Sequence, residues 1–110
     1  YNFYINNLSH LNWMNLPTKE NDNIILNYFT LTVSPLIRNK LLSYLNQHQV
    51  GASIYYKKPI HLQKAVLEKY KKISMKKTEK ISKSVISLPF YSFPKVNELE
   101  YLIDTIKKFK

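Results

Sequence analysis

Glycine occurs only once in these 110 residues, at Gly51. Glycine adopts left-handed backbone more readily than any other residue, so this chain cannot form a glycine-rich loop that cradles a phosphate. Gly51 follows an amphipathic segment and precedes the β-branched and aromatic residues 53–56. We therefore predict a helix that ends at a left-handed glycine and leads into a strand, which stops before Pro59 because proline donates no sheet hydrogen bond. The polar turn that follows, from His61 to Gln63, is where we expect a ligand to bind.

A strand and a helix are predicted directly upstream. Residues 24–33 are rich in β-branched and aromatic side chains, and their alternation predicts a strand with a core-facing side made of Phe29, Leu31 and Val33. Ser34 and Pro35 then match a helix N-cap followed by a first-turn proline. This helix is expected to run through residue 49, with an apolar face formed by Ile37, Leu41, Leu42, Tyr44, Leu45 and His48.

Both ends of the chain show a helical pattern. Residues 1–9 have one apolar stripe, formed by Tyr1, Tyr4, Ile5 and Leu8. No capping residue precedes this stripe and the chain does not begin with methionine, which favours a piece of a longer protein. Near the other end, Asn97 and Glu100 have the layout of a capping box, and the helix that follows has a stripe of Leu99, Leu102, Ile103 and Ile106.

Shorter elements are predicted between these. We expect a helix within residues 61–72, another that Thr78 caps with Ile81 facing the core, and a buried strand at residues 85–89 that proline ends. The order of all elements predicts an α+β fold with a small sheet and helices packed on one of its faces. A length of 110 residues corresponds to one domain, covering residues 1–110.

The charge of the chain is strongly positive, at +10, yet 16 of its 17 basic residues are lysine. Readers of phosphates and base edges favour the guanidinium fork of arginine. We therefore interpret most lysines, and the one arginine, Arg38, as solvated surface charges, so that nucleic acid is an unlikely partner. A module that binds anions such as nucleic acid remains an alternative. No apolar run reaches the ~20 residues of a membrane helix, which together with the absence of a signal-peptide pattern favours a cytoplasmic protein without a membrane partner.

No catalytic residue and no metal site are predicted from the residues. Cysteine is absent, and the three histidines, His10, His48 and His61, lie 38 and 13 residues apart without metal-ligand spacing. The two aspartates do not form a pair for acid–base catalysis.

Histidine 61 and the preceding tyrosine pair are the candidate binding residues. A lone turn histidine more often bonds the backbone, and that alternative stays open on the residues alone. In a strand, Tyr55 and Tyr56 would point to opposite faces, so that one joins the core and the other presents its hydroxyl.

Two ordered blocks resemble a known family. Residues 50–63 resemble the segment G-I-G-A-S-x-Y-Y-x-x-P-x-H-L-Q of the DegT/DnrJ/EryC1/StrS aminotransferases, and residues 79–91 resemble their segment E-x-x-S-x-x-V-L-S-L-P-x-Y/F. Residues 98–103 resemble the closing helix of that family. The resemblance covers essentially the whole chain.

The resemblance implies the C-terminal small domain of a fold-type I enzyme that uses pyridoxal phosphate to aminate nucleotide-linked keto sugars, in cell-envelope polysaccharide or antibiotic-sugar biosynthesis. It places the cofactor and its lysine in a large domain that this chain does not resemble, so no cofactor binding and no catalysis are expected of the chain alone. The implied partners are that large domain or a second copy, and a nucleotide-linked sugar. Tyr56 and His61 are the implied substrate-side residues, with Tyr55 and Gln63 behind them.

Some positions depart from the family pattern. Asn27 stands where the family often has histidine, Gln49 stands where glycine is common, and the lysine-rich residues 69–80 replace a glycine and a proline. These losses favour the product of a truncated or decaying gene. A ligand-free interaction domain is a further alternative, for which Trp13, Tyr28 and Tyr1 would form an exposed strip that self-associates.

Overall fold

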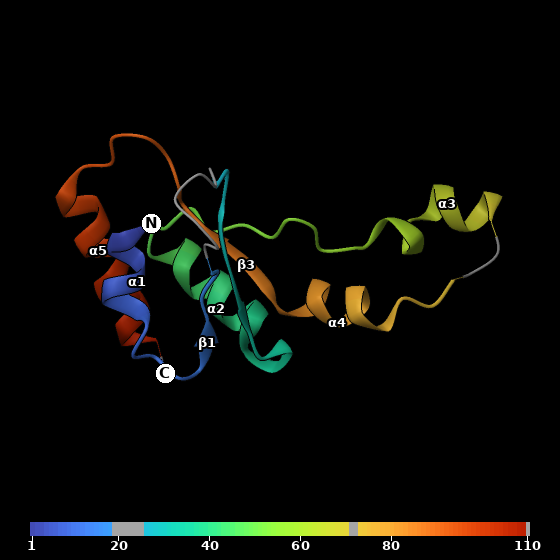
Figure 1. Cartoon of the computed structure of the whole chain (residues 1–110), viewed down its shortest axis with the longest axis horizontal. Helices are drawn as coiled ribbons and strands as arrows, with labels where there is room; N and C mark the ends of the chain where they lie inside the picture. Colours follow the sequence, from blue (N-terminus) through green and yellow to red (C-terminus); the bar gives the residue numbers. More distant parts are fainter. Residues whose placement is uncertain (19–25, 71–72, 110) are drawn as a thin grey trace.

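The computed structural model describes residues 1–18, 26–70 and 73–109, and it has an α+β fold as predicted (Figure 1). A body contains the sheet, and an arm formed by residues 55–70 and 73–84 projects from it (Figure 1). The elements in chain order are α1 (Asn2–Leu8), β1 (Met14–Asn15), β2 (Phe29–Val33), α2 (Pro35–Gln47), the 3₁₀ helix η1 (Ile60–Leu62), α3 (Lys64–Lys69), α4 (Lys76–Ser84), β3 (Val85–Leu88) and α5 (Val96–Lys108).

The sheet is antiparallel, in the order β1-β2-β3. Strand β2 lies in the middle, with Phe29 opposite Leu88, Leu31 opposite Ile86, and Val33 opposite Met14. The predicted alternation of β2 is confirmed, because its core-facing side chains are buried and its two threonines are partly exposed. The described strand begins only at Phe29. Residues 26–28 lie outside it, and residues 24–25 of the predicted strand lie outside the described ranges.

The core lies between the sheet and the helices of the body. It includes the predicted stripes of α1, α2 and α5, through Tyr4, Leu8, Leu41, Leu45, Leu102, Ile103 and Ile106. Strand β3 is buried along its whole length, as predicted for residues 85–89. Strand β1 was not predicted, because two residues are too few for a period to be read from the sequence.

Helix α2 begins as predicted, since the Ser34 side chain accepts a hydrogen bond from the Leu36 amide at 3.4 Å and Pro35 occupies the first turn. Helix α5 begins two residues earlier than predicted. Its N-cap is Lys95, whose carbonyl accepts bonds from the amides of Glu98 and Leu99 at 3.1 and 3.2 Å. These backbone bonds replace the predicted capping box.

The end of α2 corrects the prediction for Gly51. Helix α2 ends at Gln47, and the left-handed residue is Gln49, with φ of 60°, while Gly51 has no positive φ. The Val50 amide bonds to the Leu45 carbonyl at 2.9 Å and the Gln49 amide to the Asn46 carbonyl at 3.0 Å, which is the Schellman pattern. The helix therefore turns two residues before the glycine, and His48 is exposed at its end rather than part of the core face.

Replacing Gln49 by glycine is expected to stabilise the protein. A side chain in left-handed backbone costs roughly 1 kcal/mol that glycine avoids. Urea unfolding of Gln49→Gly should show a higher midpoint with an unchanged slope. Gln47→Gly, within the same helix, should lower the midpoint instead. A loss of stability in Gln49→Gly would contradict the Schellman end of α2.

The predicted strand at residues 53–56 is reduced to one residue. Ser53 and Ser87 exchange two backbone bonds of 3.0 and 2.7 Å, after which the chain leaves the sheet. Both Tyr55 and Tyr56 are therefore exposed, and the expectation that one of them joins the core is wrong. The propensity of the run was overridden because no strand pairs with it beyond Ser53.

The arm also differs from prediction. Helix α3 forms within the expected range but buries none of its side chains. Helix α4 begins at Lys76, with Thr78 inside it rather than at its cap, and Ile81 is exposed. Figure 1 places α3 at the far end of the arm, away from the sheet. None of the described helices is long and apolar enough to cross a membrane.

Two expectations about surface residues are also wrong. Trp13 and Tyr1 are partly buried, with the Trp13 ring 5.6 Å from that of Phe109 and the Tyr1 ring 6.0 Å from that of Phe29, so only Tyr28 of the predicted strip is exposed. Arg38, expected in solvent, is buried in α2.

Candidate functional site

The four predicted binding residues all line one pocket of about 910 Å³, at the arm. Tyr55 and Tyr56 come from the loop after Ser53, and His61 and Gln63 from η1 and the residue that follows it. The opposite wall comes from α4, β3 and the residue before α4, through Met75, Thr78, Ile81, Ser82 and Val85. The pocket therefore forms where the two blocks of the sequence approach each other.

The tyrosines form an aromatic edge to this pocket. The Tyr55 ring lies 4.7 Å from that of Tyr28 and 6.0 Å from that of Tyr56, to which it is nearly perpendicular. Tyr56 is 76% exposed, so its ring and hydroxyl are free to meet a ligand. Tilted and edge-on contacts of this kind are favourable arrangements of aromatic rings.

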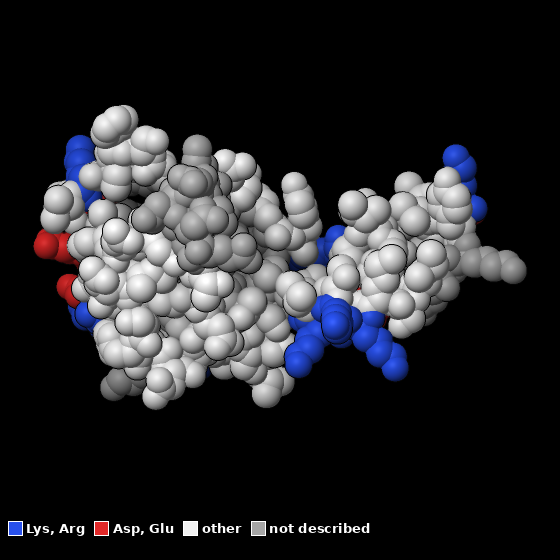
Figure 2. All heavy atoms as spheres, viewed as in Figure 1, with Lys and Arg blue, Asp and Glu red and all other residues white. Residues whose placement is uncertain are grey.

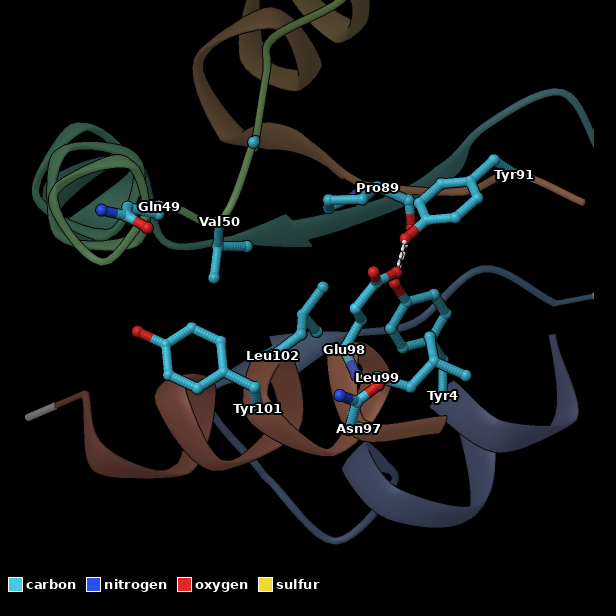
Figure 3. Close-up of a pocket in the computed structure, with 11 residues that line it drawn as sticks. Tyr4, Gln49, Val50, Pro89, Tyr91, Asn97, Glu98, Leu99, Tyr101 and Leu102 are labelled. Atoms are coloured by element: carbon cyan, nitrogen blue, oxygen red, sulfur yellow. Dashed lines mark hydrogen bonds between the residues drawn. The ribbon is translucent and has the colours of Figure 1, made fainter. Parts of the chain in front are cut away.

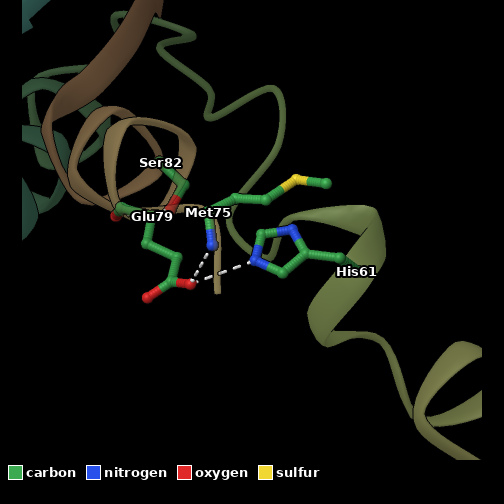
Figure 4. Close-up of polar contacts among 4 residues, drawn as sticks. All are labelled: His61, Met75, Glu79 and Ser82. Carbon is green, nitrogen blue, oxygen red and sulfur yellow. Dashed lines mark hydrogen bonds and ion pairs between the residues drawn. The ribbon is translucent and has the colours of Figure 1, made fainter. Parts of the chain in front are cut away.

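His61 is tied to α4 (Figure 4). Its ring is only 8% exposed, and Nε2 lies 3.2 Å from Oε1 of Glu79. The same carboxylate oxygen accepts the Met75 amide at 2.9 Å, and Ser82 donates to the Glu79 carbonyl at 2.9 Å. Sequence reasoning did not assign a role to Glu79 or Ser82. The available signal was that both belong to the E-x-x-S part of the second block.

The bonds to its carboxylate keep Glu79 ionised. The Met75 amide first, and then His61, lower the pKa of Glu79. Because the folded pKa lies below the unfolded one, this contact stabilises the arm above the unfolded value of about 4.3 and the stabilisation is lost as pH falls through the folded pKa.

Acidification is therefore expected to release the contact between η1 and α4. In a pH titration followed by NMR, the Met75 amide resonance should move as Glu79 becomes protonated. The Glu68 carboxylate, which faces Lys64 across 3.7 Å on the exposed side of α3, serves as a comparison. An unchanged Met75 amide between neutral pH and pH of about 2 would contradict the Met75–Glu79 contact.

A second pocket, of about 690 Å³, lies in the body between the end of α2 and the start of α5 (Figure 3). Tyr91 donates to Glu98 at 2.7 Å, and the buried Tyr4 donates to the Pro89 carbonyl at 2.6 Å. Burial raises the pKa of Tyr4 to about 12, so this hydroxyl remains a donor. These polar groups satisfy one another, and none of the four predicted binding residues lines this pocket. We therefore take the arm pocket as the candidate site.

The positive charge of the chain is concentrated in the arm. Residues 55–84 contain ten lysines and two glutamates, so they account for +8 of the net charge of +10. Figure 2 shows lysines gathered where the arm narrows and at its tip. Lys58 lies on the pocket wall itself. The described lysines of this segment are exposed, as the sequence interpretation expected, and their clustering favours an anionic ligand at the arm.

The lining of this pocket can be compared with the groups that a metal ion or a pyridoxal cofactor requires. Among the described residues no group of three or more histidines and acids could hold a metal ion. A pyridoxal cofactor needs a desolvated lysine for its Schiff base and an acid for its ring nitrogen. Within the described lining the only lysine is Lys58, which is exposed, and the carboxylate of Glu79 is engaged by His61 and Met75. The residues of this pocket do not fit the cofactor.

Solved structures with the fold of this chain include aminotransferases. The family model described as the DegT/DnrJ/EryC1/StrS aminotransferase family matches residues 1–107, and the chain belongs to this family.

Individual proteins are similar to this chain in sequence and fold. NtdA from Bacillus subtilis, solved with bound cofactor PMP, is 27% identical with a TM-score of 0.81 over 97% of this chain and 27% of its own. DesV from S. venezuelae, solved with a ketimine intermediate, shares the fold with a TM-score of 0.84 at 23% identity, over 96% of this chain and 28% of its own. A curated relative, the "Pleiotropic regulatory protein" of Geobacillus stearothermophilus, is 29% identical over 73 residues, which are 66% of this chain and 20% of that protein. The chain therefore spans about a quarter of the length of these relatives.

Proposed function

We propose that this chain is the small domain of a pyridoxal-phosphate-dependent sugar aminotransferase, in which it forms one wall of the site for a nucleotide-linked keto sugar. The observation that supports this most is the meeting of Tyr55, Tyr56, His61 and Gln63 at one pocket in a member of this family. The ring of Tyr56 is available to stack on a base or sugar, and Lys58 is available to a diphosphate.

The cofactor would be held by a large domain, either joined to this chain or contributed by a second copy. When bound there, pyridoxal phosphate supplies the electron sink for amino transfer. The residues of the present chain bind and orient the sugar, and they cover one side of the site. The setting would be the cytoplasm, where the chain would act in the biosynthesis of amino sugars.

The test joins residues 1–107 to the large domain of a family member of known substrate, in place of its own small domain, and measures amino transfer. In this chimera His61→Gln is expected to lower kcat/KM about 10- to 100-fold, which corresponds to the ~1–3 kcal/mol of an unsatisfied polar group in the site. Tyr70→Ala, an exposed aromatic residue of the arm that does not line the pocket, is the matched control. A folded chimera without activity would contradict the proposed function, and an active chimera indifferent to His61 would contradict the proposed site.

The proposal that the large domain, and not this chain, holds the cofactor has a separate test in the isolated chain. Incubation with pyridoxal phosphate, reduction with borohydride and peptide mass mapping should label lysines only as a scattered background. Stoichiometric labelling of one lysine would show that the chain holds a cofactor site of its own.

The charge of the arm favours a second candidate, an anion-binding module. In that case binding of a labelled single-stranded oligonucleotide would weaken steeply with salt and would not depend on Tyr56 or His61. Under the proposed function, oligonucleotide binding is weak, and substitutions of Tyr56 and His61 weaken the binding of sugar nucleotides.

A further inference from the structure

The second ring nitrogen of His61 is the feature that the proposed function leaves unused. Nε2 is bonded to Glu79, whereas Nδ1 lies on the other edge of the ring (Figure 4) and makes no hydrogen bond to any described residue. Within the described chain, the side-chain nitrogens that are fully enclosed without a partner both belong to Arg38, so Nδ1 is not fully enclosed. His61 is 8% exposed and lines the pocket, which leaves Nδ1 as the ring nitrogen available to a ligand there.

The contacts of Glu79 decide which nitrogen carries the proton. Oε1 of Glu79 accepts the Met75 amide, and its pKa is lowered, so the group is an ionised carboxylate that only accepts hydrogen bonds. The nitrogen that lies 3.2 Å from it must therefore donate. The opposite tautomer would direct the lone pair of Nε2 at a carboxylate oxygen. In a neutral imidazole the remaining nitrogen, Nδ1, is then an acceptor.

We propose that Glu79 is the positioning residue of this site: it holds His61 as the Nε2–H tautomer, so that Nδ1 accepts a hydrogen bond from a hydroxyl group of the ligand. The ligand assignment rests on the proposed function, whereas the tautomer does not. A sugar hydroxyl is a donor and fits this nitrogen. A phosphate oxygen is an acceptor and does not, so the diphosphate of a sugar nucleotide lies elsewhere, towards Lys58.

His48 provides an internal reference for the opposite tautomer. Its Nδ1 lies 2.8 Å from the carbonyl oxygen of Tyr44, which only accepts, so His48 is held as the Nδ1–H tautomer. One protein therefore contains both tautomers, each imposed by an acceptor of known identity.

The tautomers are read from two-bond and three-bond nitrogen–proton correlations in the ¹⁵N-labelled chain at neutral pH. His61 should show the Nε2–H pattern and His48 the Nδ1–H pattern, with His61→Gln identifying the signal. In Glu79→Ala the acceptor is absent, so the tautomer of His61 is no longer fixed and its two nitrogens should show the averaged signals of exchanging tautomers. In Glu79→Gln one amide oxygen can still accept from both Nε2 and the Met75 amide, so the Nε2–H pattern should remain. Glu68→Ala, on the exposed side of α3, should leave it unchanged. An Nδ1–H pattern in the unmodified protein, or no change in a folded Glu79→Ala, would overturn the role of Glu79.

The proposed hydrogen bond from the ligand to Nδ1 of His61 is tested on the same sample with UDP-N-acetylglucosamine and with UDP. The sugar nucleotide should move the Nδ1 resonance of His61 in the direction of an accepted hydrogen bond. UDP, which has ribose hydroxyls but no hexose, should not. A response to both probes, or to neither, would overturn the assignment to a hexose hydroxyl. Such a result combined with the expected tautomer would count against the ligand and the proposed function while supporting the positioning role of Glu79.

Discussion

Replacing Phe29 by alanine is expected to lower the free energy of unfolding by about 3–5 kcal/mol, the usual range for a fully buried phenylalanine. The Phe29 side chain is 0% exposed, and its ring lies 4.5 Å from that of Tyr4 and 6.1 Å from that of Phe90. It therefore joins β2 to α1 and to the segment after β3. Domains have total stabilities of about 5–15 kcal/mol, so this loss leaves the body only marginally folded.

The control for this substitution is the same chemical change on the surface. Phe93 is 97% exposed, and Phe93→Ala should change the free energy of unfolding by less than about 0.5 kcal/mol. Circular dichroism during urea and thermal unfolding of both variants measures the difference. Similar midpoints for the two variants would contradict the placement of Phe29 at the centre of the core.

Replacing Arg38 by methionine is expected to stabilise the protein, by about 1–4 kcal/mol. Arg38 is 6% exposed, and its Nε and Nη1 atoms are enclosed without a hydrogen-bond partner among the described residues. A buried charge with unsatisfied donors carries a desolvation cost that its contacts do not offset. Methionine has a similar length and flexible packing without that cost.

The neighbouring residue provides the comparison for Arg38. Asn39 is exposed on the same helix, and Asn39→Met should change stability by less than about 0.5 kcal/mol. Both variants are compared by urea unfolding. A loss of stability in Arg38→Met, with Asn39→Met unchanged, would mean that the guanidinium of Arg38 is stabilised by an interaction that offsets its burial.

The parts of the fold that could be predicted are those in which one local signal agrees with burial. The alternation in β2, the Ser34–Pro35 start of α2 and the stripe of α5 each depend on a period or a cap within a few residues. The start of α5 and the end of α2 were misplaced because backbone bonds from Lys95 and Leu45 competed with side-chain preferences worth only about 1 kcal/mol.

The arm shows the opposite case. Its helices have apolar residues at positions such as Leu67 and Ile81 that resemble a core stripe, yet the structure leaves these side chains exposed. Whether an apolar face is buried depends on which element lies against it, and that is a property of the packed chain rather than of a short window. The same holds for Arg38, which is buried in α2, a helix that packs against α4 and β3.

For the candidate site, the sequence indicated the residues but not the contacts between them. Two blocks of residues resembled the family, and Tyr55, Tyr56, His61 and Gln63 were named from the first of them. By itself the sequence determined the family, the α+β class and the main core stripes, because these depend on residue type and short spacing. Only the tertiary structure decided that Glu79, 18 residues after His61, bonds its ring at Nε2 and that Nδ1 has no partner among the described residues, because such a contact arises when distant segments pack together.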